Sequence, residues 1–282
     1  MTFSFKDRYD STNYTGTLIV DALNLAFRWK HTGKYNQFKE DFERTIASIA
    51  NSYKCGNIIL TADWGSSAYR KAIFPKYKAD RAEKFKDQTE EEKRAFKEFF
   101  EEYEATLDLL QEKYIVLRYK NVEADDIAAH LVLNKLQYEL NDVWLLSSDD
   151  DWSLLVEEGV SRFSWRTRKE ITIDNWNEHY EVTPEQFISY KCLMGDKSDN
   201  IPGIVGIGPK RASALLLEYD SAFDLYDSVP LSGKAQNIKN LNENAEQLLK
   251  NYELMDLRTY CDEAIGKEKL KDIRGRMGDV FF

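Results

Sequence analysis

Short apolar runs, three of which end in an aspartate, recur in the first 150 residues of the chain. The runs that end in aspartate cover residues 17–21, 57–63 and 142–149, and a shorter apolar run lies at residues 115–117. Uninterrupted apolar runs of this length are typical of strands that are covered on both faces. The pattern therefore predicts a mostly parallel sheet.

Segments with helical periodicity separate or follow these runs. They cover about residues 41–53 and 90–110, and the pattern turns helical again after Thr183. Residues 160–165 and 170–173 have strand character and flank a basic turn, which predicts a hairpin. Strands that alternate with helices predict an α/β fold with helices on both faces of a central sheet.

The same pattern predicts how the chain is divided. We expect an α/β core over residues 1–183, which a long insertion without strand character interrupts at about residues 64–104. Pro75 breaks the first half of this insertion, and its second half has a helical pattern. We expect residues 184–282 to form a helical region that packs on the core.

Carboxylates at the strand ends are the first functional signal. In parallel α/β sheets ligands lie outside the carboxyl ends of the strands, so Asp21, Asp63 and Asp149 are predicted to meet at one edge. Each has a simpler explanation, because acidic residues also cap helices and are favoured in their first turn. Taken alone, each could have only that structural role.

Further acidic residues strengthen the signal. They are Glu123, Asp125 and Asp126, then Asp151, and finally Asp196 and Asp199. So many carboxylates in one place repel one another unless cations are present, and Mg²⁺ is a cation that prefers oxygen ligands. The scattered histidines His31, His130 and His179 are predicted to be structural, so a zinc site is not expected. We interpret the cluster as a two-metal centre for phosphodiester hydrolysis.

The charge of the chain complicates a nucleic-acid substrate. The formal net charge of −10 argues against a surface that binds phosphates. The charge is segregated, however, because residues 66–86 contain seven basic and two acidic residues, whereas residues 87–104 contain three basic and eight acidic residues. Hydrophobic residues make up 43% of the chain, which is enough for a sizeable core. The total charge is therefore a poor guide to the surface that faces a ligand.

The cellular location is predicted from what the sequence lacks. No apolar run reaches the roughly 18–20 residues that span a bilayer, and the first residues do not resemble a secretory signal. Cys55, Cys192 and Cys261 are isolated and predict no disulfide framework. We therefore expect a cytoplasmic protein that does not bind membranes.

The glycine-rich segment at residues 203–212 is the most specific local pattern. A helix, a turn at Gly206 and Gly208, and a second helix would point backbone N–H groups outward. Lys210 and Arg211 add positive charge beside the turn. Such a turn binds a phosphate backbone without reading its sequence. The alternative is a plain connection in which a glycine ends a helix.

Five blocks of residues, taken in order, resemble the 5′-nuclease superfamily. This superfamily contains flap endonucleases, phage 5′-exonucleases and the N-terminal nuclease domain of bacterial DNA polymerase I. The blocks are residues 20–24, 74–81, 123–126, 148–152 and 194–203, and the similarity runs from about residue 17 to residue 260. Residues 162–165 and 186–189 make the chain look most like the phage-encoded 5′-exonuclease/flap endonucleases.

The resemblance implies a PIN-like core, a helical arch at residues 64–104 through which a 5′ single strand passes, and a helix-hairpin-helix-type motif at residues 203–212. It implies a Mg²⁺-dependent enzyme that cuts DNA flaps and 5′ ends, and primer RNA in RNA–DNA hybrids, during phage-type replication. Mn²⁺ is expected to substitute for Mg²⁺, and K⁺ to bind at the glycine turn. The enzyme is expected to act as a monomer in an infected bacterial cell.

The resemblance also implies roles for individual residues. Asp21, Asp63, Glu123 and Asp125 are expected to hold one metal ion, and Asp126, Asp149, Asp151, Asp196 and Asp199 to surround a second. Lys78 is expected to polarise the scissile phosphate, and Arg81 to steady it as charge builds. Contacts with DNA are expected from Arg28, from Tyr77 by stacking on a base or sugar, and from Gly203, Gly206, Gly208, Lys210 and Arg211.

Some features depart from the family pattern, and other functions stay open. Asp150 adds charge where relatives usually carry a small or neutral residue, and the distal arch is unusually acidic. The basic tail after Gly266 is consistent with a duplex contact or with a solvated face. A small RNase on a similar sheet is the enzymatic alternative, although it would lack the long insertion and the glycine turn. A non-catalytic binder of branched DNA would be expected to have lost some carboxylates.

Overall fold

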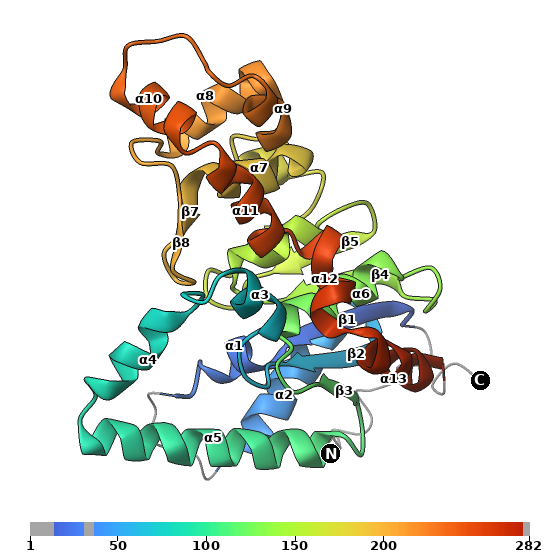
Figure 1. Cartoon of the computed structure of the whole chain (residues 1–282). Coiled ribbons are helices and arrows are strands. Elements are labelled where there is room, and N and C mark those ends of the chain that lie inside the picture. The colour runs from blue at the N-terminus through green and yellow to red at the C-terminus, as the bar shows by residue number, and fades with distance from the viewer. Residues whose placement is uncertain (1–13, 31–36, 279–282) are drawn as a thin grey trace.

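A six-stranded sheet forms the centre of the computed structural model, which describes residues 14–30 and 37–278 (Figure 1). The strands lie in the order β3-β2-β1-β4-β5-β6. Their bounds are β1 Gly16–Asp21, β2 Cys55–Ala62, β3 Ile115–Arg118, β4 Asn141–Leu146, β5 Val160–Phe163 and β6 Glu170–Ile171. Neighbouring strands are parallel except for β5 and β6, which form the predicted hairpin. The predicted mostly parallel α/β fold is confirmed.

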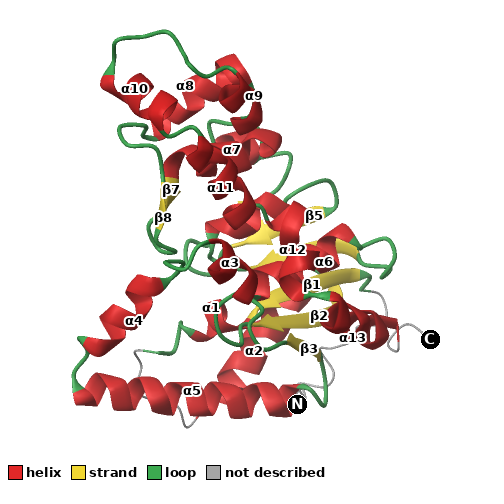
Figure 2. Cartoon of the chain, in the orientation of Figure 1, coloured by secondary structure: helices red, strands yellow, loops and turns green. Residues whose placement is uncertain are grey.

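Helices cover both faces of the sheet (Figure 2). In the first 183 residues they are α1 Ala22–Ala26, α2 Phe38–Ser52, α3 Ala68–Ile73, α4 Ala79–Lys86, α5 Glu90–Leu110 and α6 Ala124–Leu133, with 3₁₀ turns at η4 Asp150–Leu155 and η5 Trp176–Glu178. Leu18 and Val20 of β1 face a layer formed by α1, α2 and α5, whereas Ile19 faces α6. Burial on both faces explains why these strands are unbroken apolar runs in the sequence.

The insertion between β2 and β3 consists of α3, α4 and α5. Figure 1 shows α4 leading away from the sheet and α5 returning along the bottom of the view. α5 begins with a capping box, in which the side chains of Thr89 and Glu92 each accept a hydrogen bond from the other's backbone N–H. Phe99 and Tyr103 of α5 are buried in the cluster between α2 and the sheet, and they fix α5 to the core.

The second half of the chain is helical, as predicted, apart from one short ribbon. Its elements are α7 Pro184–Met194, β7 Gly195–Asp196, β8 Ile201–Pro202, α8 Pro209–Tyr219, α9 Ala222–Asp227, α10 Gln236–Glu243, α11 Glu246–Met255, α12 Leu257–Ile265 and α13 Lys267–Gly278. β7 and β8 pair antiparallel, so the glycine turn follows a ribbon, and the prediction of a helix before it is wrong. Gly195, at φ +67°, ends α7 and turns the chain into the ribbon.

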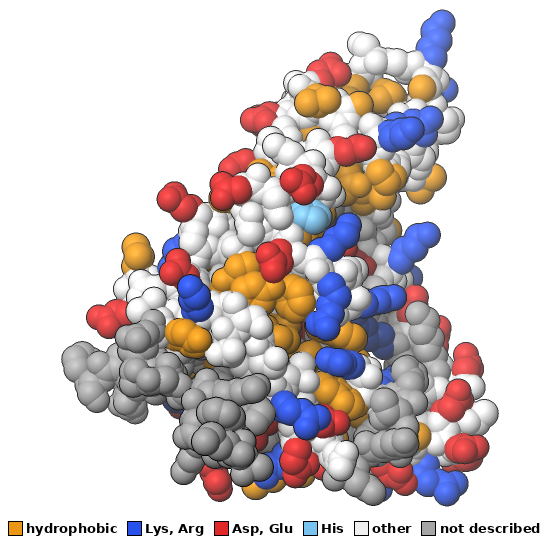
Figure 3. Space-filling model, turned by 180° about the vertical axis from the view of Figure 1, so that it is seen from behind, with side chains coloured by type: hydrophobic (Ala, Val, Ile, Leu, Met, Phe, Trp, Pro, Cys, Tyr) orange, Lys and Arg blue, Asp and Glu red, His pale blue; other side chains and the backbone are white. Residues whose placement is uncertain are grey.

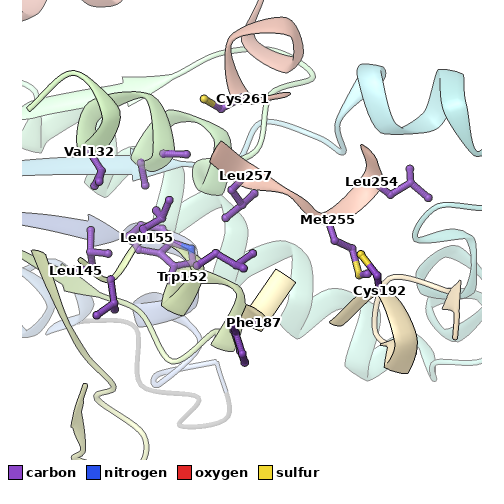
Figure 4. Close-up of a cluster of buried hydrophobic side chains, with 14 of the residues drawn as sticks. Val132, Leu145, Trp152, Leu155, Phe187, Cys192, Leu254, Met255, Leu257 and Cys261 are labelled. Atoms are coloured by element: carbon purple, nitrogen blue, oxygen red, sulfur yellow. The ribbon is translucent and has the colours of Figure 1, made fainter. Parts of the chain in front are cut away.

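One hydrophobic cluster joins the sheet to the C-terminal helices. Figure 4 shows Trp152 and Leu155 of η4 beside Leu257 of α12, and Cys192 of α7 beside Met255 of α11. All of these side chains belong to the cluster that also contains the apolar residues of α6. The C-terminal helices therefore share a core with the sheet and do not form a separate body.

A polar clasp also fastens α12 to α6. The two ring nitrogens of His130, a fully buried residue of α6, lie 2.6 Å from a carboxylate oxygen of Asp262 and 2.8 Å from the Tyr138 hydroxyl.

His31, which is also predicted to be structural, lies outside the described residues. All three cysteines are unpaired and buried. Among the described residues, no helix is both long and apolar enough to cross a bilayer.

Candidate metal centre at the carboxyl edge of the sheet

The carboxyl ends of β1, β2 and β4 lie side by side at the middle of the sheet. β1 pairs with β2 on one side and with β4 on the other, so the chain leaves β1 toward one side of the sheet and returns to its other side at β4. Asp21 ends β1, Asp63 follows β2, and Asp149 follows β4. Parallel α/β sheets bind ligands at this kind of position. The structure therefore brings the three strand-end aspartates to one edge.

Hydrogen bonds hold Asp21 and Asp63 in place. Asp21 caps α1, and its two oxygens accept hydrogen bonds from the Asn24 backbone N–H at 3.2 Å and from Ser147 Oγ at 2.7 Å. Asp63 Oδ1 accepts a hydrogen bond from the backbone N–H of Ala124 at 2.6 Å. Because Ala124 is the first residue of α6, Asp63 fixes the start of the helix that carries the next carboxylates.

Asp125 and Asp149 meet this pair from α6 and η4. Asp125 Oδ1 accepts a hydrogen bond of 2.6 Å from Nε1 of Trp152, whose indole is fully buried. Asp149 caps η4 by accepting a hydrogen bond of 3.0 Å from the backbone N–H of Asp151. The buried indole therefore aims Asp125 toward the strand ends.

Burial and mutual repulsion leave these carboxylates poorly compensated. Burial, together with the charge of Asp63, raises the pKa of Asp21 to about 8. Burial and then Glu123 raise the pKa of Asp63. Burial and the nearby Asp149 and Asp21 hold the pKa of Asp125 well above its usual value. Buried carboxylates in such surroundings need either protons or cations. A donor set made only of oxygens fits Mg²⁺ or Mn²⁺.

A lysine side chain inside the cluster compensates part of the negative charge of these carboxylates. Within residues 14–30 and 37–278, no three Asp, Glu, His or Cys side chains are arranged as a ready-made metal site. Lys191 of α7 forms an ion pair with Asp151, and its Nζ lies 3.8 Å from Asp196. Our sequence reasoning missed Lys191, although its place on the helix that leads directly to Asp196 is a usable signal.

A second group of charges surrounds Glu123. Lys78 Nζ donates to Glu123 Oε1 at 2.7 Å, and Arg70 Nη1 approaches Oε2 at 3.4 Å. Lys78 Nζ also lies 3.5 Å from Asp199, to which Arg81 donates at 2.9 Å. Burial alone would lower the pKa of Lys78, but Glu123 and Asp199 outweigh burial and raise it. Lys78 therefore stays charged at the base of the insertion.

Tyr77 is held by Glu123 at the base of the insertion. It is 3% exposed, and its hydroxyl donates to Glu123 Oε2 at 2.8 Å. In this arrangement the Tyr77 ring is not open to a ligand, and its stacking on a base or sugar stays a prediction. The physical reason is that the backbone N–H of Lys78 donates to the Asp199 carbonyl at 2.9 Å, which holds this segment against the loop after β7.

Asp126 is likewise held by a hydrogen-bond partner. It is fully buried, and both of its carboxylate oxygens accept hydrogen bonds from the Arg70 guanidinium, at 2.7 and 2.8 Å. Asp126 is therefore the ion-pair partner of Arg70 in this structure, and its place around a metal ion stays a prediction. Asp125 and Asp126 are consecutive helix residues, which point in directions about 100° apart, so they meet different neighbours.

The added charge of Asp150 is neutralised locally. Arg162 Nη2 donates to Asp150 Oδ1 at 2.8 Å, while Nη1 of the same guanidinium donates to the Asp149 carbonyl.

Arg28, just after α1, is exposed, with its guanidinium 5.2 Å from the centre of the Trp29 ring. Figure 3 shows the molecule from behind the view of Figure 1. Lys and Arg side chains gather along one flank of this face, although the chain is acidic overall.

The glycine turn lies in the C-terminal half, beyond the β7–β8 ribbon. A Cβ at Gly203 would lie 2.2 Å from a backbone oxygen of α7, so only glycine fits there. Gly206 has φ +85°, a conformation that glycine adopts without strain. Gly208 caps α8, and Lys210 and Arg211 in the first turn of that helix are exposed. Arg211 Nη1 donates to the Gly206 carbonyl at 2.6 Å.

Comparisons with known proteins match nearly all of the chain. One family model, described as "5'-3' exonuclease, N-terminal resolvase-like domain", matches residues 16–183. A second, "5'-3' exonuclease, C-terminal SAM fold", matches residues 182–276. The flap endonuclease of Escherichia phage T5 is 43% identical over 250 residues, which are 88% of this chain and 85% of that protein.

Two further relatives extend the comparison. DNA polymerase I of Streptococcus pneumoniae is 29% identical over 275 residues, which cover 90% of this chain but only 29% of that longer protein. A crystal structure of the phage T5 flap endonuclease in complex with DNA and metal ions has a TM-score of 0.89 and 38% sequence identity. The match covers 94% of this chain and 98% of the other. The resemblance inferred from the sequence motifs is confirmed.

Proposed function

The chain belongs to the 5′–3′ exonuclease family and is a structure-specific 5′ nuclease, and we propose that it hydrolyses phosphodiester bonds of flapped and nicked DNA with divalent metal ions. The observation that carries the metal dependence is electrostatic. Asp21 is buried and Asp63 and Asp125 are partly buried, and desolvation together with repulsion from neighbouring carboxylates raises the pKa of each. Two Mg²⁺ ions, or Mn²⁺ in their place, would supply the missing positive charge.

The carboxylates divide into two sets around the cluster. Asp21, Asp63, Glu123 and Asp125 would hold one ion, and Asp149, Asp151, Asp196 and Asp199 the other. Bound ions of this kind lower the pKa of a coordinated water and offset the charge that builds on the phosphate. Lys191 forms an ion pair with Asp151 and lies near Asp196, so an ion held by the second set would compete with its ammonium group.

Lys78 and Arg81 are the side chains placed to contact the scissile phosphate. The Lys78 side chain is only 9% exposed and is held by Glu123, so its charge is fixed before the substrate arrives. The Arg81 side chain is 57% exposed, and its pair with Asp199 contributes little stability in solvent. Arg81 can therefore turn from Asp199 to a phosphate at small cost, while Lys78 stays in place.

The glycine turn would bind the duplex beside the cut site. Backbone N–H groups at the start of α8, with the exposed Lys210 and Arg211, suit a phosphate backbone. Arg28 would contact the strand that is cut. A K⁺ ion at the turn stays part of the proposal. It would use carbonyls other than those of Val205 and Gly206, which already accept hydrogen bonds from Asn240 and Arg211.

The arch formed by α3, α4 and α5 would admit a 5′ single strand. Its base, around Lys78 and Arg81, is basic, whereas α5 begins with Glu90, Glu91 and Glu92. We propose that the enzyme acts as a monomer on DNA flaps, on nicked duplexes and on RNA–DNA hybrids. We place it in the cytoplasm of an infected bacterial host.

Cleavage of a panel of 5′-labelled substrates tests this function. The panel contains a flap, a nicked duplex, an RNA–DNA hybrid and a free single strand, each with Mg²⁺, with Mn²⁺ and with a chelator. We expect the flap and the nicked duplex to be cut with either metal and nothing to be cut in chelator. Cleavage that persists in chelator would remove the metal from the proposal. Cleavage of single-stranded RNA alone would favour the small RNase instead.

A further inference from the structure

The first turn of α6 carries two adjacent aspartates with different surroundings. Asp125 accepts a hydrogen bond from Trp152 and faces the other strand-end carboxylates. Asp126 faces α3 instead, where both of its oxygens accept hydrogen bonds from one guanidinium, that of Arg70. Two acidic residues that look equivalent in the sequence therefore serve different neighbours.

Arg70 connects three parts of the molecule that are far apart in sequence. It lies on α3, at the base of the arch, and is 4% exposed. Its Nη atoms bind Asp126 on both oxygens and approach Glu123, while its Nε donates to the Leu254 carbonyl of α11 at 2.8 Å. One side chain therefore links the arch, α6 and the C-terminal region.

The contact with α11 continues toward the glycine turn. Asn251, a fully buried residue of α11, donates from Nδ2 to the carbonyls of Cys192 and Pro202, each at 2.8 Å. Pro202 ends the β7–β8 ribbon from which the glycine turn leaves. On the other side of α11, the Tyr69 hydroxyl of α3 donates to Glu253 at 3.1 Å. α11 therefore spans the distance from the duplex-binding segment to the base of the arch.

We propose that Asp126 and Arg70 are positioning residues and that neither binds metal: Asp126 aims Arg70, and Arg70 sets Glu123 and the base of the arch against α11. The inference rests on the proposed metal-dependent nuclease function, because Glu123 is one of its metal-binding carboxylates. A ligand role for Asp126 would require it to leave Arg70, a buried cation, with only the more distant Glu123 as an acidic partner. Moving Asp126 from Arg70 to a metal ion would break both hydrogen bonds of the pair, which is unfavourable.

Metal binding and cleavage, measured on the full chain, separate this role from that of a ligand. The test variant is Asp126→Asn, and Asp125→Asn is the matched control on the same helical turn. Calorimetry gives the Mn²⁺ affinity without DNA, and single-turnover cleavage of a flap at saturating metal gives the rate of the chemical step. Binding of the flap in Ca²⁺ and the melting temperature complete the set.

We expect Asp125→Asn to weaken Mn²⁺ binding at least tenfold and Asp126→Asn to change it less than twofold. Asp126→Asn should nevertheless lower the single-turnover rate at least tenfold, with flap affinity within threefold of wild type. The double variant Arg70→Met/Asp126→Leu replaces the buried pair with apolar side chains of similar size, and it serves if Asp126→Asn fails to fold. It should likewise keep the Mn²⁺ affinity and lose single-turnover rate.

Two results would overturn the inference. A loss of Mn²⁺ affinity in Asp126→Asn as large as that in Asp125→Asn would make Asp126 a ligand. An unchanged single-turnover rate together with a lowered melting temperature would reduce the pair to a fold-stabilising contact. A wild-type chain that does not cut with Mg²⁺ would instead contradict the proposed function, while the Mn²⁺ affinities would still decide whether Asp126 binds metal.

Discussion

Aspartates stand at both ends of β4, and the two ends differ completely. Asp142 near the amino end is exposed and lines an open cavity of about 370 Å³ together with Lys54. Asp149 beyond the carboxyl end is also exposed, but it shares its surroundings with Asp151 and Lys191, and desolvation by the surrounding protein together with Asp151 raises its pKa to about 6. Residue type and strand are the same. The number of neighbouring charged groups, and not the exposure of the aspartate itself, distinguishes the two edges.

The amino edge is stabilised by aromatic contacts and not by charge. The rings of Tyr53 and Trp144 stack with their centres 3.9 Å apart, and the Tyr53 hydroxyl donates to Glu170 at 2.6 Å. No comparable group of facing carboxylates occurs at that end among the residues that line the cavity. A strand-end aspartate therefore indicates a site only when other carboxylates share its surroundings.

The largest expected effect separates the two ends of β4 directly. Asp149→Asn keeps the shape of the side chain but removes a charge from the cluster, so cleavage of a flap should fall on the order of 10³-fold or more. Asp142→Asn is the matched control, because asparagine tolerates its φ of +40°, and its activity should equal that of wild type. Equal losses in single-turnover assays would refute the comparison.

Lys78→Ala is expected to have the next largest effect. The variant removes a fixed positive charge beside Glu123, and we expect the single-turnover rate to fall on the order of 10²–10³-fold with a smaller change in flap affinity. Lys76→Ala, two residues earlier and exposed, is the control, because the structure shows a contact only with its backbone carbonyl. A rate for Lys78→Ala that matches the control would remove Lys78 from the site.

A moderate effect is expected on stability in the absence of metal. Asp63→Asn keeps the acceptor for the Ala124 N–H but removes one of the repelling charges, so the melting temperature should rise. A gain of 1 kcal/mol corresponds to roughly 2–4 °C for a chain of this size. Asp142→Asn should leave the melting temperature unchanged. Calorimetry in chelator checks both variants, and a lower value for Asp63→Asn would show that the cluster is not strained.

The smallest expected effect concerns the amino edge. Tyr53→Phe removes the hydrogen bond to Glu170 and keeps the stack on Trp144, so the free energy of unfolding should fall by about 0.5–1.5 kcal/mol. Urea denaturation measures this change, and cleavage should be unaffected. A loss of cleavage here would show that the two edges are coupled through the sheet.

The sequence was sufficient to predict the positions that backbone regularity controls. Asp21, Asp63 and Asp149 meet because parallel strands place their carboxyl ends at one edge, and an apolar run shows where each strand ends. Glu123 and Asp125 follow from the start of a helix beside that edge. These predictions need only the period of the pattern and the direction of the strands.

Side-chain partners from distant helices could not be predicted in this way. Arg70 meets Asp126 across 56 residues, and Lys191 meets Asp151 across 40. Such contacts depend on how far each helix is rotated about its axis and on what packs behind it, and the sequence pattern fixes neither. The β7–β8 ribbon escaped prediction for another reason: two residues on each side are too few to give a periodic signal.

The clasp between His130 and Asp262 has a consequence for how the protein is made. A ribosome releases every strand of the sheet, and all of α6, before it releases α12. Until then, the face of α6 that α12 covers is exposed, and until α11 has been released Arg70 also lacks the Leu254 carbonyl. We therefore expect a growing chain to be inactive until translation has passed α12.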